Sequence, residues 1–166
     1  WGLSSPDVMT AWVALSPSTI EAGAMRVVPG TQHEQVTHKD TFNPENMLTR
    51  GQEVEVDVDP SKAVDIVLKP GEMSLHHIKL VHGSDANRSN DRRIGMSIRY
   101  IPTYVRQTKV RDSAVLVRGI DKYHHFDAEP RPQADLDEAA LAAHADAVGR
   151  QVKALYQGTA KTAFRA

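Results

Sequence analysis

The residues with the clearest chemical potential are His82 and the segment that follows it. His82 ends an apolar run, Gly83 and Ser84 come next, and Arg93 lies eleven positions after His82. An imidazole binds Fe(II) well, and a guanidinium binds a carboxylate through two parallel charge-assisted hydrogen bonds. This histidine and arginine therefore suit an iron site that also holds a dicarboxylic acid. Taken alone, His82 is more simply explained as a core histidine.

The composition bounds the class of protein that can carry such a site. The chain has 166 residues, 40% of them hydrophobic and 25% charged, with a net charge of −1, and we expect a single globular domain over residues 1–166. The absence of cysteine excludes disulfides, Fe–S clusters and thiolate catalysis. The near-neutral charge predicts neither nucleic acid nor membrane as a partner. No segment approaches transmembrane length and no signal peptide is visible, so a cytoplasmic location is expected. The oligomeric state is not predicted.

The first two-thirds of the chain shows the pattern of short strands separated by turn residues. Strands are expected over residues 8–15, 24–28, 52–59, 63–68, 72–82 and 93–101. Several short strands without intervening helices favour an antiparallel sandwich or barrel. Residues 31–51 have weak periodicity and predict a long surface loop that acts as a lid.

The C-terminal part of the chain has a different pattern. Residues 135–157 are rich in alanine, with Leu141, Val148, Val152 and Leu155 at helical spacing and Gly158 just beyond. Acidic residues early in this segment and basic residues late in it match the helix macrodipole. The pattern predicts an amphipathic helix that packs against the sheet.

Strand alternation indicates which arginine faces the site. In the strand 93–101, one face carries polar and small residues, namely Arg93, Gly95, Ser97 and Arg99, and the other carries apolar ones. Such a division is expected where one face lines a wet cavity, so Arg93 is favoured over Arg92. Antiparallel strands are expected to bring Arg93 to His82, with the Ser84 hydroxyl available to the same carboxylate.

Three stretches of the chain resemble the phytanoyl-CoA dioxygenase family: TAWVALS at 10–16, MRVVPGTQH at 25–33, and LKPGEMSLHHIKLVHGSDANRSNDRR at 68–93. The HGS-x-x-N-x-S segment with its following arginine is the most specific part. The resemblance covers residues 1–105. It implies a mainly β fold, a double-stranded β-helix of the cupin-type jelly roll, whose core is 1–105 and to which a C-terminal helix is added. It also implies Fe(II) and 2-oxoglutarate as cofactors.

The resemblance implies roles for individual residues. His82 matches the distal histidine of an iron-binding triad. Arg93 matches the arginine that binds the far carboxylate of 2-oxoglutarate, and Ser84 matches its hydroxyl partner. Trp12 matches a tryptophan that lines the cosubstrate pocket, although a plain core aromatic is nearly as good an explanation. No catalytic residue is expected beyond the metal site.

The other two protein ligands of the triad do not match this chain. The family's His-x-Asp falls a few residues before the position of Trp1, so we expect these ligands upstream and the domain to be truncated at its N-terminus. His38-Lys39-Asp40 has the right letters, but it lies in the predicted loop and a bare motif match of this kind is weak. It is not expected to bind the metal.

Two adjacent histidines precede His82. Alternation along a strand 72–82 places His76 on the same face as His82. His77 matches a histidine of the family at the same offset. Either one is a candidate for contact with the substrate or with the groups that surround the metal, and a structural role is about as good an explanation.

The resemblance implies a dioxygenase that uses O₂ and 2-oxoglutarate to hydroxylate an unactivated C–H bond of a small-molecule substrate. Two alternatives stay open. Related halogenases replace the triad carboxylate with Gly or Ala and admit chloride, and the residue that decides between them is not in this chain. A non-catalytic cupin-like binding domain is the second alternative. The substrate itself is not predicted.

Overall fold

The computed structural model of the chain describes residues 2–42 and 51–157. The chain divides into two compact units, Pro6–Ile101 and the combination of Trp1–Ser5 with Pro102–Ala166. Each unit is considered by itself below. All the residues that the sequence singles out for a site belong to the unit Pro6–Ile101.

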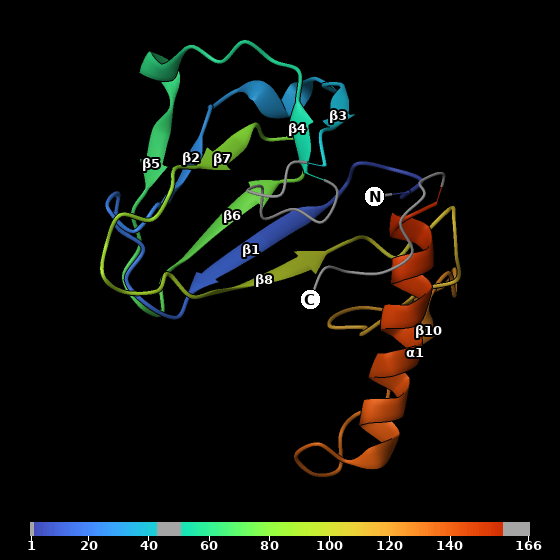
Figure 1. Ribbon diagram of the computed structural model, residues 1–166. Helices are drawn as coiled ribbons and strands as arrows, with labels where there is room; N and C mark the ends of the chain where they lie inside the picture. The colour runs from blue at the N-terminus through green and yellow to red at the C-terminus, as the bar shows by residue number, and fades with distance from the viewer. Residues whose placement is uncertain (1, 43–50, 158–166) are drawn as a thin grey trace. The chain divides into compact units, whose positions relative to one another are not determined.

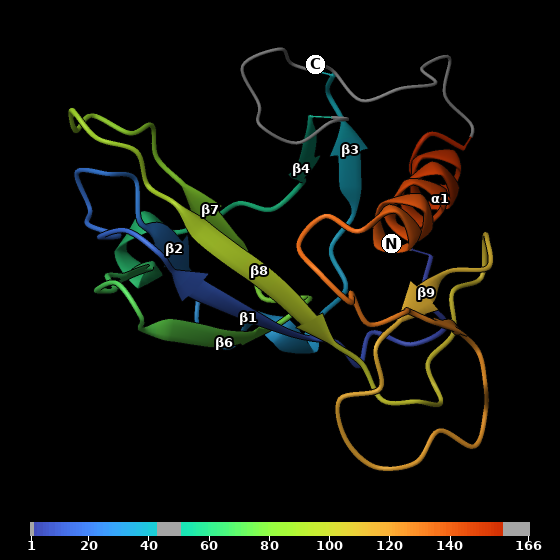
Figure 2. The ribbon, with the colours of Figure 1, turned by 90° about the horizontal axis from the view of Figure 1, so that it is seen from below.

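This unit is built from two antiparallel sheets of three strands. In one sheet β1 (Met9–Ala14) lies between β6 (Met73–His77) and β8 (Gly95–Tyr100); in the other β2 (Met25–Val27) lies between β5 (Val64–Ile66) and β7 (His82–Ser84). Figures 1 and 2 show the sheets as two layers, with β5, β2 and β7 on one side and β6, β1 and β8 on the other. The mainly β jelly-roll fold is confirmed.

β1 forms the centre of its sheet because its residues can be packed on both faces. Ala11 and Ala14 are 3% and 0% exposed, and Val8, just before the strand, is 2% exposed. These small and branched residues allow close neighbours on both sides of the chain. In the facing sheet, Met25 and Val27 of β2 are also buried. The two central strands therefore supply half of the buried apolar residues described in this unit.

The expected strand 72–82 is wrong as a single element. β6 ends at His77, a turn follows, and β7 begins at His82 in the other sheet. Leu80 N–H donates to the His77 carbonyl (3.0 Å), and Lys79 N–H donates to Nδ1 of the His77 ring (3.2 Å). The turn is stabilised by a histidine side chain and contains no Gly or Pro, so the usual turn signals are absent.

The expected strand 52–59 is also shorter than the alternation of its valines suggested. β4 covers only Gln52–Val54, and a 3-10 turn follows at Pro60–Lys62, where the Asp59 side chain accepts from Ser61 N–H. β4 pairs with β3 (His38–Asp40), a strand inside the predicted loop 31–51. A short 3-10 turn at Thr31–His33 precedes β3. The part of that loop at 43–50 lies outside the described residues.

The unit that contains the C-terminal part of the chain has one long helix. α1 (Glu138–Leu155) begins after Asp137, whose carboxylate accepts from Ala140 N–H at 2.8 Å. This is a normal N-cap, and it confirms the predicted helix with ends two or three residues inside the expected ones. A parallel pair of two-residue strands, β9 (Ser113–Ala114) and β10 (Asp127–Ala128), belongs to the same unit. Within the described residues, none of the helices has the length and apolarity needed to cross a membrane.

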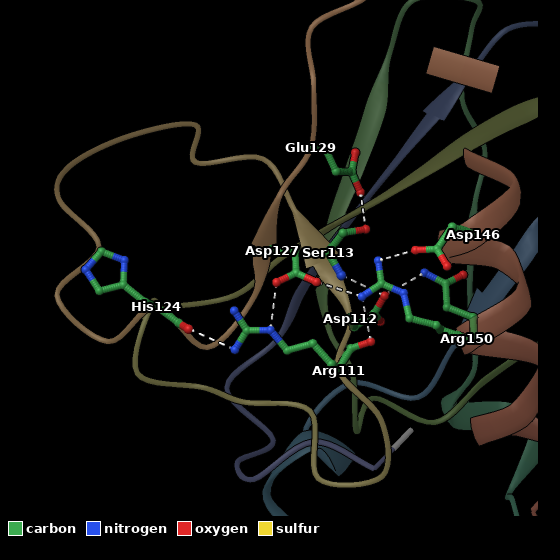
Figure 3. A network of polar contacts seen from close by, with 9 residues as sticks. Arg111, Asp112, Ser113, His124, Asp127, Glu129, Asp146 and Arg150 are labelled. Atoms are coloured by element: carbon green, nitrogen blue, oxygen red, sulfur yellow. Dashed lines mark hydrogen bonds and ion pairs between the residues drawn. The ribbon is translucent and has the colours of Figure 1, made fainter. Parts of the chain in front are cut away.

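Asp127 joins α1 to this strand pair (Figure 3). Its Oδ1 accepts from Arg111 Nε and its Oδ2 from Arg150 Nη1, both at 2.8 Å. Arg150 also pairs with Asp146 one helical turn earlier (3.1 Å) and donates to the Arg111 carbonyl (3.0 Å). One carboxylate therefore holds two guanidinium groups, one of which belongs to the helix.

This arrangement predicts that acid weakens the C-terminal unit. Hydrogen bonds from Arg111 and then Arg150 hold the pKa of Asp127 below its usual value of 3.8. A carboxyl with a lowered folded-state pKa contributes stability above its unfolded pKa, and this contribution is lost as the pH falls through the folded pKa. Asp127→Asn should therefore flatten the acid limb of the helix signal followed by circular dichroism between pH 5 and 2. Asp135→Asn, which removes the same charge without these contacts, should leave the limb in place; equal profiles for both variants would contradict the prediction.

Candidate functional site

The polar face of the sheet β6-β1-β8 is turned toward the second sheet. Register pairs Thr10 with His76 and Arg99, and Trp12 with Ser74 and Ser97, so these side chains share one face. The opposite face carries Met73, Leu75 and Met96, which are 57%, 62% and 48% exposed. This is the reverse of a simple sandwich, in which apolar residues face inward. The interior between the sheets is therefore suited to a polar ligand.

His82 faces this interior from β7. It pairs with Val27 of β2, and Ser84 pairs with Met25, so both share a face with the buried side chains of β2. Nδ1 of His82 lies 2.7 Å from the Leu80 carbonyl oxygen. A carbonyl only accepts, so Nδ1 carries the proton and Nε2 of the neutral ring keeps its lone pair. This is the second contact that usually orients a metal-binding histidine.

Arg93 comes to the same interior from the other sheet. Its Nη2 lies 3.4 Å from Ser84 Oγ, which uses one of the five guanidinium donors. Its position two residues before β8 continues the polar face of that strand. His82 and Arg93 therefore belong to opposing sheets, and the expectation that paired antiparallel strands bring them together is corrected. The sandwich, not a hairpin, brings their segments to face one another.

Ser16 fixes the backbone around Arg93. Its hydroxyl donates to the Arg92 carbonyl (3.0 Å) and accepts from Ile94 N–H (2.7 Å), so it bridges the residues on both sides of Arg93. This role of Ser16 has no signal in the sequence, because a serine that precedes a proline indicates no more than a turn. These two bonds favour the register in which Arg93 points to the interior and Arg92 does not.

Trp12 lies beside Arg93 on the same face. The Cζ atom of Arg93 is 5.3 Å from the centroid of the indole ring, within the range of a cation–π contact. Trp12 is half-buried. The indole therefore forms one wall of the space around the guanidinium, with Ser84 on another side.

His76 meets His82, but from a different strand than expected. Their ring centroids are 5.7 Å apart with the planes inclined at 51°. The Nδ1 atom of His76 lies 3.4 Å from Ser74 Oγ. Partial burial lowers the pKa of His76, and the nearby His82 and Arg99 add to this effect. His76 is thus a half-buried side chain next to the candidate metal ligand, in surroundings that disfavour its charged form.

His77 lies on the other face of β6, opposite Met9, and its ring accepts from the backbone at Lys79. The structure therefore does not bring His77 into the interior with His76. Arg99, which strand alternation had placed on the polar face without a role, does lie there. Partial burial lowers the pKa of Arg99, because the charged form loses hydration.

The described residues do not complete a metal centre around His82. In residues 2–42 and 51–157, no three His, Asp or Glu side chains are grouped so as to hold a metal ion. His38 is exposed, with Nδ1 3.1 Å from the Val36 carbonyl oxygen, and Asp40 accepts from Gln52 Nε2 at 2.9 Å. His38 and Asp40 therefore lie in β3, which pairs with β4, and both side chains make polar contacts there.

Comparison with known proteins finds similar structures among non-haem enzymes. It is similar to the solved structure of the non-haem monooxygenase ThoJ in its apo form (37% identity, TM-score 0.81, 94% of this chain and 56% of the other) and in its nickel complex (33%, 0.73, 94% and 55%). It also shares the fold of CytC3, solved with Fe(II) and alpha-ketoglutarate (24%, 0.50, 71% and 42%). No match is found among curated proteins.

Two facts from these comparisons bear on the assignment. The chain spans little more than half the length of the ThoJ structures. The model of the phytanoyl-CoA dioxygenase family matches residues 3–95, which is more than half of the 166 residues and includes every strand of the two facing sheets except most of β8. The chain therefore belongs to the phytanoyl-CoA dioxygenase family.

Proposed function

We propose that the chain forms the cosubstrate-binding part of an Fe(II)- and 2-oxoglutarate-dependent oxygenase that hydroxylates an unactivated C–H bond of a small molecule. The observation that carries this proposal is the polar interior, where His82 presents Nε2 from one sheet and Arg93 approaches Ser84 from the other. Family membership and the similarity to a non-haem monooxygenase support the same class of reaction.

His82 would supply one imidazole ligand to the iron through Nε2, because Nδ1 is held by the Leu80 carbonyl. The remaining protein ligands would come from polypeptide outside the described residues. When bound, the iron with 2-oxoglutarate and O₂ supplies the oxidising power for removal of hydrogen from the substrate. The protein's own part is to fix the geometry of the ligands and to limit the access of water.

Arg93 would bind the far carboxylate of 2-oxoglutarate. A guanidinium matches the planar carboxylate with two parallel donors, and the Ser84 hydroxyl can add a third hydrogen bond from β7. Trp12 would lie along the carbon chain of the cosubstrate, since its ring is next to Arg93. Thr10, His76 and Arg99 extend the same polar face beyond Trp12 and would be available to the substrate or to groups around the metal.

The test is release of CO₂ from 2-oxoglutarate labelled at C1, measured with the polypeptide that contains this chain, Fe(II) and O₂. We expect iron-dependent formation of CO₂ and succinate, even without the true substrate, at a slow uncoupled rate. Addition of the chelator EDTA should stop it. If the protein binds neither Fe(II) nor 2-oxoglutarate under these conditions, a non-catalytic binding domain would replace this proposal.

A further inference from the structure

Gly95 occupies a position where any side chain would displace the Trp12 ring. It is the first residue of β8 and pairs with Ala14, while Trp12 pairs with Ser97 two residues further along. A Cβ atom placed on Gly95 would overlap Cζ2 and Cε2 of the Trp12 ring and would lie 2.8 Å from Cη2. The backbone of Gly95 is not in the left-handed region that favours glycine. The requirement for glycine is therefore steric and comes from the indole.

The indole reaches Arg93 by crossing Gly95. Arg93 and Gly95 are two residues apart and lie on the same side of the chain, so a ring that covers Gly95 extends toward the guanidinium. The Cζ atom of Arg93 is 5.3 Å from the ring centroid, and Nη2 is 3.4 Å from Ser84 Oγ. An arginine side chain has many rotamers, and a contact along its length reduces their number. The ring thus favours the arginine conformation that points to Ser84.

We infer that Gly95 is a positioning residue for the Arg93 guanidinium: it admits the Trp12 ring onto β8, and that ring holds Arg93 toward Ser84 for carboxylate binding. This inference rests on the proposed function, since the carboxylate is that of 2-oxoglutarate. A purely structural role for Gly95 would differ in one respect. Its substitution would then lower stability without changing the affinity of the folded protein for 2-oxoglutarate.

The experiment measures the Kd of 2-oxoglutarate by equilibrium dialysis under anaerobic conditions with Fe(II), on the polypeptide that contains this chain. Gly95→Ala should weaken binding roughly tenfold, as expected for loss of a partly buried cation–π contact together with the arginine geometry that it supports. Trp12→Phe removes Cζ2 and Cη2, two of the three ring atoms that the new methyl group would meet. By itself it should weaken binding only about threefold, because a smaller ring still faces the cation.

The double variant separates positioning from folding. If the methyl group acts through the indole, Gly95→Ala combined with Trp12→Phe should bind no more weakly than Trp12→Phe alone. Gly83→Ala is the matched control: it adds the same methyl group in β7, between His82 and Ser84, where a Cβ would meet nothing within 4 Å. It should bind 2-oxoglutarate like the wild type.

Wild-type affinity in Gly95→Ala would overturn the inference, and so would a double variant as weak as Gly95→Ala. If Gly95→Ala does not fold, Trp12→Phe still decides, because it creates no overlap; unchanged affinity in that variant would overturn the role of the ring. If the wild-type protein itself does not bind 2-oxoglutarate, the proposed function is overturned. The wild-type measurement therefore separates failure of the proposed function from failure of the inference about Gly95.

Discussion

Replacing His82 with alanine should abolish iron-dependent turnover of 2-oxoglutarate. His82 shares a face with the buried side chains of β2, and its Nδ1 atom is held by a backbone carbonyl, which leaves Nε2 for a metal. Loss of a group that merely supports a metal ligand costs roughly 10- to 100-fold, so loss of the ligand itself should exceed about 100-fold. The measurements are CO₂ release and bound iron per protein after gel filtration.

His77→Ala is the matched control, because it also removes an imidazole, but from the face of β6 that is turned away from the second sheet. We expect it to retain iron, although loss of the contact with the Lys79 amide should lower stability slightly. If His82→Ala kept the wild-type iron content while His77→Ala lost it, the assignment of the two faces would be wrong. Both variants should keep the β-rich circular dichroism spectrum of the parent.

The sequence predicted those elements whose pattern is contained in one continuous segment of the chain. The apolar run around β1 indicates a strand buried on both faces, and Ala11 and Ala14 are buried as expected. The spacing of leucine and valine between 135 and 157 predicted α1. Alternation in β8 separated Arg93 and Arg99 from the apolar residues between them. Each of these inferences depends on the period of one element, which is a local property.

The predictions that failed are those that required knowledge of which strands pair. The segment 72–82 contains no Gly or Pro, and its turn is stabilised by the His77 ring, so no usual turn signal marked the change of sheet. His76 was placed beside His82 by alternation along one strand; it lies beside His82 because two sheets face one another. The contribution of Ser16 is of the same kind, since it bonds to residues 76 and 78 positions away.

The site also shows why a family motif and a geometric argument are complementary. The resemblance supplied the roles of His82 and Arg93, whereas the contacts among Arg93, Ser84 and Trp12 come from the structure. Gly95 is the clearest example. In the sequence it is one small residue on a polar face. The structure shows why a glycine is needed there, because the Trp12 ring lies over it.

Replacing Arg93 with alanine should weaken binding of 2-oxoglutarate while leaving the iron content unchanged. Arg93 lies just before β8, in the sheet opposite to that of His82, and contacts Ser84 and Trp12. Hydrogen bonds to charged groups contribute roughly 1.5–3 kcal/mol, which corresponds to about 10- to 150-fold in affinity. The effect should appear as a raised KM for 2-oxoglutarate. Arg93→Lys keeps the charge but loses the two parallel donors, so an intermediate KM is expected.

Arg92→Ala provides the control for this prediction, because Arg92 is the adjacent residue and is exposed. Ser16 contacts the backbone carbonyl of Arg92, which the substitution keeps. It should leave KM for 2-oxoglutarate near the wild-type value. The pair of variants tests the register directly, since a shift of one residue would exchange their effects. Normal 2-oxoglutarate affinity in Arg93→Ala, together with weak binding in Arg92→Ala, would show that the guanidinium facing Ser84 is not the one that binds the cosubstrate.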